Sequence, residues 1–228
     1  MSFANVRFRG VERNDRSMHT IETADDIAAA VAALARAEPR FGAIAALTGL
    51  PALRRRRGGL AALLRTVIDQ QISLAAGAAI WGRLEACLAP FEAATLLAAS
   101  DADLRACGLS AGKVRTLRAV AAAAAAGSLD FRRLETLPDD EANAMLTAVH
   151  GIGPWTADIY LLTCLGRTDV WPVGDLALQA AAAAAFGLAE RPTAAEMRGM
   201  GEPWRPWRAV AARLLWAHYR HMNGLPAA

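Results

Sequence analysis

The sequence predicts an all-α fold. Alanine-rich segments with apolar residues three and four positions apart recur along the 228 residues, which is the pattern of amphipathic helices. Runs of β-branched residues, which are typical of strands, are few. Because 54% of the residues are hydrophobic, the chain can bury a substantial core, as one domain or as two closely associated helical lobes.

Composition excludes several classes of protein. No run of about eighteen apolar residues is free of charges, and the first residues lack the apolar core of a secretory signal, so we expect a cytoplasmic protein without membrane association. The net charge of +3 permits nucleic-acid binding without demonstrating it. Cys87, Cys107 and Cys164 are widely spaced and form neither a disulfide framework nor a four-ligand metal pattern.

The first part of the chain contains an arm, two helices and a basic run. Residues 1–19 are polar and show no helical stripe, so we expect a flexible arm. Thr23, with Asp26 three residues later, indicates the start of a helix that runs to Pro39, and a further helix is expected over residues 41–47. The four arginines at residues 54–57 are either a solvated linker or a patch that contacts phosphates.

Two apolar helical runs after Gly59 are interrupted at residues 69–73. Gln70 and Gln71 are unusual as core residues, and they fit either helix caps or a loop that exposes an amide to stacked bases. Lys113, the single lysine among 25 basic residues, should lie on a solvated helical turn. It is the only side-chain amine available as a nucleophile. In this region helices are expected over residues 75–88, 91–99, 101–108 and 113–126.

Residues 139–165 are predicted to form two short helices joined by a tight turn. Three acids open the first helix, where they favour the positive end of its dipole. Gly151 and Gly153 flank one apolar residue and permit a sharp reversal, and Pro154 suits the first turn of the second helix. Outward N–H groups at such a turn would bind a DNA phosphate without any side chain. An ordinary helix–helix turn is the alternative.

A second loop, which contains Pro172 and Gly174, leads to Asp175 and an uncharged helix from Leu176 to about residue 185. An aspartate in this position is commonly a helix N-cap. Further helices are expected from Thr193 and over residues 209–219. Trp204 and Trp207 are predicted to lie in the core, although aromatic rings can also stack on bases.

The hairpin at residues 150–154, followed by Pro172, Gly174 and Asp175, resembles the helix-hairpin-helix-Gly/Pro-Asp superfamily of DNA glycosylases. The likeness extends from about Arg54 to Tyr219 and is closest to the alkylation-repair branch of DNA-3-methyladenine glycosylase II type. It implies a monomeric, monofunctional enzyme that flips alkylated purines out of duplex DNA and hydrolyses the N-glycosidic bond in base excision repair. In a bacterium such an enzyme would associate with the nucleoid.

The resemblance also implies roles for individual residues. Asp175 would be the catalytic carboxylate that stabilises positive charge on the sugar. Trp155, Ile159 and Trp216 would line the base pocket, with Ile159 in the place of a tyrosine of some relatives. Relatives with lyase activity carry a lysine where this chain has Trp155. The chain should therefore form no Schiff base and leave the DNA strand intact.

By the same resemblance, DNA would be bound by Gly151, Gly153 and Trp155 of the hairpin and by Gln70 and Gln71. Gln71 falls where a side chain fills the gap left by the flipped nucleotide. The backbone carbonyls of Thr147, Val149 and Ile152 would hold a structural monovalent cation. No cofactor for catalysis is expected, and no iron–sulfur cluster, because no cysteine follows Cys164.

We expect three parts: the arm at residues 1–19, a lobe of residues 20–58 plus 168–228 that carries Asp175, and a lobe of residues 59–167 that carries the hairpin. DNA would bind in a cleft between the lobes, and no amino-terminal β-domain is expected. Two alternatives remain. The same hairpin occurs in non-catalytic modules that bind DNA structures, and a glycosylase for mismatched or oxidised bases would share the fold.

Overall fold

The computed structural model describes residues 20–225, so the predicted arm lies outside the described residues. Within this range the chain is helical, and its β pairing consists of one isolated bridge between Thr20 and Arg167. The helices are α1 (Ala24–Ala37), α2 (Pro39–Thr48), α3 (Leu60–Ile68), α4 (Leu74–Leu88), α5 (Ala93–Ala98), α6 (Asp101–Ala106), α7 (Ala111–Ala125), α8 (Phe131–Thr136), α9 (Asp139–Thr147), α10 (Pro154–Thr163), α11 (Leu176–Phe186), α12 (Ala194–Gly201), the 3-10 helix η1 (Glu202–Trp204) and α13 (Arg208–Met222). The all-α prediction is confirmed.

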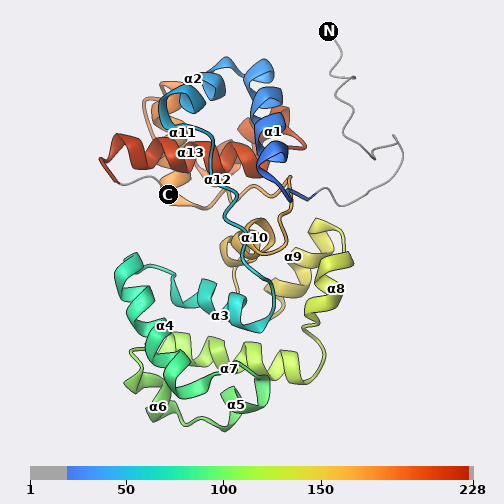
Figure 1. Cartoon of the computed structure of the whole chain (residues 1–228), viewed down its shortest axis with the longest axis vertical. Helices are drawn as coiled ribbons and strands as arrows, with labels where there is room; N and C mark the ends of the chain where they lie inside the picture. The colour runs from blue at the N-terminus through green and yellow to red at the C-terminus, as the bar shows by residue number, and fades with distance from the viewer. Residues whose placement is uncertain (1–19, 226–228) are drawn as a thin grey trace.

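The helices form two groups (Figure 1). Helices α1, α2, α11 and α13 pack on one another in the upper half of the view. Below them, α3 packs on α7 and α10, and α10 packs on α9. The chain passes from the first group to the second through residues 49–59 and returns through residues 164–175. The lobe boundaries expected from the sequence remain a prediction.

An aromatic cluster fills the first group. Trp204 meets Phe41 edge-on, with 5.0 Å between ring centroids, and it stacks on Phe186 with 5.5 Å between centroids. Trp171 packs edge-on against Trp204, and its indole Nε1 donates a hydrogen bond to Met197 O at 2.7 Å. The prediction that Trp204 belongs to the core is confirmed, because only 4% of it is exposed.

Hydrogen bonds fasten both crossing segments to the carboxyl-terminal half of α10. Arg56 N donates to Thr163 O at 2.8 Å, and Arg167 N donates to Leu161 O at 3.1 Å. The buried Tyr160 accepts a bond from Gly59 N at its hydroxyl oxygen, at 2.8 Å. Helix α10 is therefore tied to both segments that connect the two helix groups.

Helix starts follow the predicted signals closely. Thr23 and Asp26 form the reciprocal capping box before α1. Helix α10 starts at Pro154 as expected, because proline fits the first turn of a helix. Helix α2 starts at Pro39 for the same reason, two residues before the expected start at residue 41. The short helix α8 was not expected, since Leu134 is the single buried residue in its six.

Candidate functional site

The turn between α9 and α10 requires glycine at one position for internal reasons. Gly151 has φ 85°, in the left-handed region, and a Cβ atom on it would lie 2.0 Å from Thr116 Oγ1 on α7. Thr116 is 7% exposed, so it has little room to move. Gly151 therefore lets the turn lie directly on α7.

Gly153 differs from Gly151. Its φ is −89°, and within residues 20–225 nothing lies within 4 Å of the place a Cβ would take. It is the N-cap of α10, and no side chain among the described residues caps this helix. Its missing side chain leaves the positive end of α10 open to close approach by an anion, as expected for a phosphate contact.

The carboxylate of Asp175 accepts three hydrogen bonds. As the N-cap of α11, its Oδ1 accepts from Leu178 N at 2.8 Å. The same oxygen accepts from Trp216 Nε1 at 3.1 Å, and Oδ2 accepts from Trp155 Nε1 at 2.8 Å. These donors stabilise negative charge on the carboxylate and fix its orientation.

The three predicted residues Asp175, Trp155 and Trp216 thus come together from α11, α10 and α13. Trp155 and Trp216 are half-buried, as is Asp175. Ile159 is also half-buried and lies one turn after Trp155, on the same side of α10. Leu176, which follows the carboxylate directly, is 62% exposed.

Neither Gln70 nor Gln71 caps a helix, so that alternative is wrong. The C-cap of α3 is Asp69, and Ser73 caps α4 with its side chain. Gln70 is half-buried, and its amide Nε2 donates to Thr156 Oγ1 in the first turn of α10. Gln71 is exposed, with φ 56°. The loop therefore presents Gln71 outward and fastens Gln70 to the hairpin helix.

The prediction of a solvated Lys113 is wrong. Lys113 is half-buried on α7, and its ammonium donates to Ile68 O at 2.6 Å and to Gln70 O at 3.0 Å. Burial lowers the pKa of Lys113, and the nearby Asp69 carboxylate opposes this effect. Its position on α7 could be predicted from the sequence, but the loop that it meets could not.

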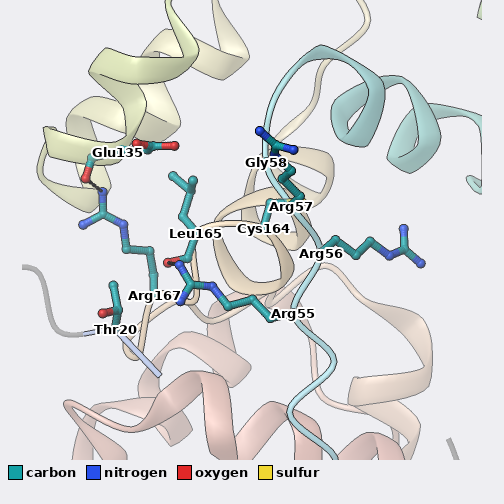
Figure 2. Close-up of a pocket in the computed structure, with 9 residues that line it drawn as sticks. All are labelled: Thr20, Arg55, Arg56, Arg57, Gly58, Glu135, Cys164, Leu165 and Arg167. Atoms are coloured by element: carbon teal, nitrogen blue, oxygen red, sulfur yellow. Dashed lines mark hydrogen bonds between the residues drawn. The ribbon is translucent and has the colours of Figure 1, made fainter. Parts of the chain in front are cut away.

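Arg55 and Arg56 attach the crossing segment to residues before α1, after α10 and at the end of α3. Arg55 pairs with Glu22 and donates to Leu165 O at 3.4 Å, and Arg56 Nη1 lies 3.8 Å from Asp69 Oδ2. Figure 2 shows Arg55 reaching toward the Leu165 end of a pocket of about 430 Å³, while Arg56 points away from it. This pocket lies at the opposite end of α10 from Pro154, so it is distant from the hairpin.

A second pocket, of about 730 Å³, lies beside α9 and α10 and is lined by several acids and arginines. One of these acids, Asp158, accepts a hydrogen bond from Asn143 Nδ2 at 3.0 Å, which links the two hairpin helices. Burial raises the pKa of Asp158 to about 7; the Asn143 bond and Arg208 lower it, and Asp139 raises it further. Neither pocket is lined by Asp175, Trp155 or Trp216.

The described residues contain no group of three or more His, Cys, Asp and Glu that could hold a metal ion. The predicted cation site uses backbone oxygens instead. Val149 O accepts a hydrogen bond from Ile152 N at 3.0 Å, which leaves it one lone pair, and Thr147 ends α9, where carbonyls lose their helical partners. Carbonyl oxygens of this kind are ligands that a monovalent cation can take, and the site remains a prediction.

The cysteines of the chain are unpaired. Cys107 and Cys164 are buried free thiols, and Cys87 is an exposed free thiol. Among residues 20–225, the helices are too short or too polar to cross a membrane.

The hairpin, the capped aspartate and the helical fold define a class of protein. The chain belongs to the HhH-GPD superfamily of base excision DNA repair proteins, whose family model matches residues 64–206. This confirms the resemblance seen in the hairpin and in the segment that leads to Asp175.

Individual relatives carry one recurrent name. DNA-3-methyladenine glycosylase 1 of Schizosaccharomyces pombe is 32% identical over 158 residues, which cover 68% of this chain and 69% of the relative. DNA-3-methyladenine glycosylase 2 of Escherichia coli is 28% identical over 166 residues, covering 67% of this chain and 55% of the relative.

Two solved structures share the fold over most of the chain. A DNA-3-methyladenine glycosidase from Bacillus halodurans superposes with a TM-score of 0.75 at 30% identity, covering 86% of this chain and 91% of the other. The 3-methyladenine DNA glycosylase of Schizosaccharomyces pombe, in complex with abasic DNA, also has a TM-score of 0.75, at 27% identity, covering 82% and 95%.

Proposed function

We propose that this protein is a DNA glycosylase that excises alkylated purines of the 3-methyladenine type from duplex DNA in base excision repair. The observation that carries the proposal is the carboxylate of Asp175, held by the indole N–H groups of Trp155 and Trp216 and by Leu178 N. The DNA-3-methyladenine glycosylases among its relatives support the choice of substrate.

Breaking the N-glycosidic bond develops positive charge on the sugar, and a fixed, negatively charged Asp175 stabilises that charge. Both carboxylate oxygens already accept hydrogen bonds, so the contribution of Asp175 is mainly electrostatic. An alkylated purine that carries positive charge gains about 0.5–2 kcal/mol against an indole face. In this proposal the flipped base lies against Trp155, Ile159 and Trp216.

The hairpin binds the DNA backbone. The open N-terminal end of α10 beside Gly153 receives a backbone phosphate, and Gln71 fills the gap that the flipped nucleotide leaves. A monovalent cation on the carbonyls of Thr147, Val149 and Ile152 would supply positive charge next to that phosphate. The protein acts as a monomer and needs no cofactor for catalysis.

The reaction is hydrolytic and leaves the strand intact. Trp155 stands where lyase relatives have their lysine, and Lys113, the single lysine, already donates to two backbone carbonyls. No side-chain amine is therefore at hand to form a Schiff base. Incubation with alkylated duplex DNA should release free bases, and strand breaks should appear only after alkali or heat. Nicking without such treatment would contradict a monofunctional reaction.

The decisive variant is Asp175→Asn, which keeps the shape of the side chain and removes its charge. Release of methylated purines should fall at least about 100-fold, as for loss of a major transition-state contact. Binding to a duplex with an abasic-site analogue should remain. Asp140→Asn removes the same charge from an exposed position on α9 and should behave like the wild type.

Three results would redirect the assignment. Equal activity of Asp175→Asn and the wild type would remove the enzymatic role of Asp175. Binding without base release by the wild type would favour the non-catalytic DNA-binding module. Release from mismatched or oxidised duplexes, but not from alkylated ones, would favour the other glycosylase class.

A further inference from the structure

The loop between α3 and α4 holds Gln71 in a strained backbone conformation. Its φ is 56°, and it is the one non-glycine residue with positive φ among residues 20–225. For an L-residue the left-handed region costs about 1–2 kcal/mol. Contacts around the loop must therefore keep Gln71 in place, since its own backbone preference opposes this conformation.

Lys113 supplies one set of these contacts. Its ammonium donates to Ile68 O at 2.6 Å and to Gln70 O at 3.0 Å, and so closes the carboxyl-terminal end of α3. Carbonyls at a helix end have no partner within the helix, and a cation there also meets the negative end of the helix dipole. A single side chain on α7 thus fixes the residues immediately before Gln71.

Gln70 supplies the second contact. Its Nε2 donates to Thr156 Oγ1, and Thr156 is 2% exposed in the first turn of α10. The backbone of Gln70 is held by Lys113 from α7, and its side chain is held by the hairpin helix. The position of Gln71 relative to the hairpin is thereby set from two sides.

We propose that Lys113 is a positioning residue for base flipping: it locks the loop of Gln70 and Gln71 onto the hairpin helix, so that Gln71 is already oriented to enter the duplex when the nucleotide leaves. This inference rests on the proposed function, because it assigns Gln71 to the vacated space. Without the ammonium, the loop relaxes toward ordinary backbone angles, and Gln71 must be reordered at each flipping event.

Four variants of the full chain test the proposal. Lys113→Met keeps the length of the side chain without its charge, and Lys113→Arg restores a cation. Arg115→Ala removes the same charge from an exposed position on the same helix, away from the loop. Gln71→Ala removes the side chain that Lys113 is proposed to position. Thermal unfolding of each variant shows whether it is folded under the assay conditions.

The readout is stopped-flow fluorescence of a duplex that carries 2-aminopurine next to an abasic-site analogue, because the fluorescence rises when stacking is lost. Lys113→Met should slow this signal about 10-fold or more, as expected for two lost charge-assisted hydrogen bonds. Lys113→Arg and Arg115→Ala should stay within about threefold of the wild type. Equilibrium binding to undamaged duplex should be nearly equal for all of these variants.

The double variant of Lys113→Met with Gln71→Ala separates positioning from general damage. If Lys113 acts through Gln71, the double variant should be no slower than Gln71→Ala alone within about threefold. Additive losses, an unchanged Lys113→Met, or an equal loss in Arg115→Ala would each overturn the proposal. If Lys113→Met does not fold, Thr156→Val takes its place. The same slowing is expected for Thr156→Val, and a rate equal to that of the wild type would likewise overturn the proposal.

The proposed function can fail separately. A wild type that releases no methylated purine but still unstacks the 2-aminopurine duplex would refute the glycosylase assignment. The fluorescence comparison of the variants would then still decide the role of Lys113.

Discussion

Gly151→Ala places a methyl group where α7 already lies. The new Cβ would be 2.0 Å from Thr116 Oγ1 and 2.9 Å from both Thr116 Cβ and Cγ2, and the backbone would stay at φ 85°. The left-handed backbone costs about 1 kcal/mol for alanine, and overpacking costs about 1–3 kcal/mol. We expect the free energy of unfolding to fall by roughly 2–4 kcal/mol, a large share of the roughly 5–15 kcal/mol typical of a domain.

The matched control is Gly153→Ala, two residues along the same turn. Its backbone is in an ordinary region and nothing among the described residues lies within 4 Å of the new methyl group, so stability should change by less than about 1 kcal/mol. Its methyl group instead narrows the open end of α10, and binding to a duplex with an abasic-site analogue should weaken. We therefore expect Gly151 to be required by the fold and Gly153 by the binding of DNA.

Urea unfolding followed by tryptophan fluorescence measures the difference. Thr116→Ala removes Oγ1 and Cγ2 but leaves its Cβ at 2.9 Å, so it should recover part of the stability lost in Gly151→Ala and not all of it. Equal stability of Gly151→Ala and the wild type would refute the reasoning. So would a loss in Gly153→Ala as large as that in Gly151→Ala.

Two further predictions concern the carboxylates. Trp155→Phe and Trp216→Phe each keep an aromatic face but remove one hydrogen bond to Asp175. Each should therefore slow single-turnover base release by about 10-fold, with little effect on duplex binding. Unchanged rates in both variants would show that the indole hydrogen bonds do not contribute to the action of the carboxylate. Asp158→Asn should stabilise the protein above pH 7. Folding raises the pKa of Asp158 from 3.8 to about 7, so the wild type loses stability as the pH rises from about 4 to about 7. The gain should be roughly 2–4 kcal/mol at most and should vanish near pH 4 in unfolding curves measured against pH; a gain independent of pH would show that burial of this charge is not its cause.

Local signals in the sequence predict most of the helices and the hairpin. Thr23 with Asp26 and Pro154 mark helix starts by chemistry that operates within one turn, and the structure bears them out. Pro39 was expected only to end the first helix, and it also opens α2, two residues before the expected start at residue 41. The glycines of the hairpin are also visible in the sequence. That Gly151 is held against Thr116, 35 positions earlier in the chain, depends on how α7 packs and could not be predicted locally.

The candidate site, too, could be predicted from the sequence only in part. The N-cap position of Asp175 follows from the helix after it. The sequence led us to expect indole faces that stack on a base, but the N–H directions of Trp155 and Trp216 are set by the packing of α10 and α13. Lys113 shows the limit most clearly, since a position on a helix does not reveal which loop lies across from it.

The three donors around Asp175 also constrain how this protein can vary. Trp155 belongs to the hairpin helix and Trp216 to the last helix, so the carboxylate connects the two helix groups in addition to its proposed role in catalysis. Glutamate, one methylene longer, could not cap α11 and keep both indole bonds without moving one group against the other. If Asp175 is the catalytic residue, a change in how the two groups pack on each other therefore also changes the position of the catalytic carboxylate.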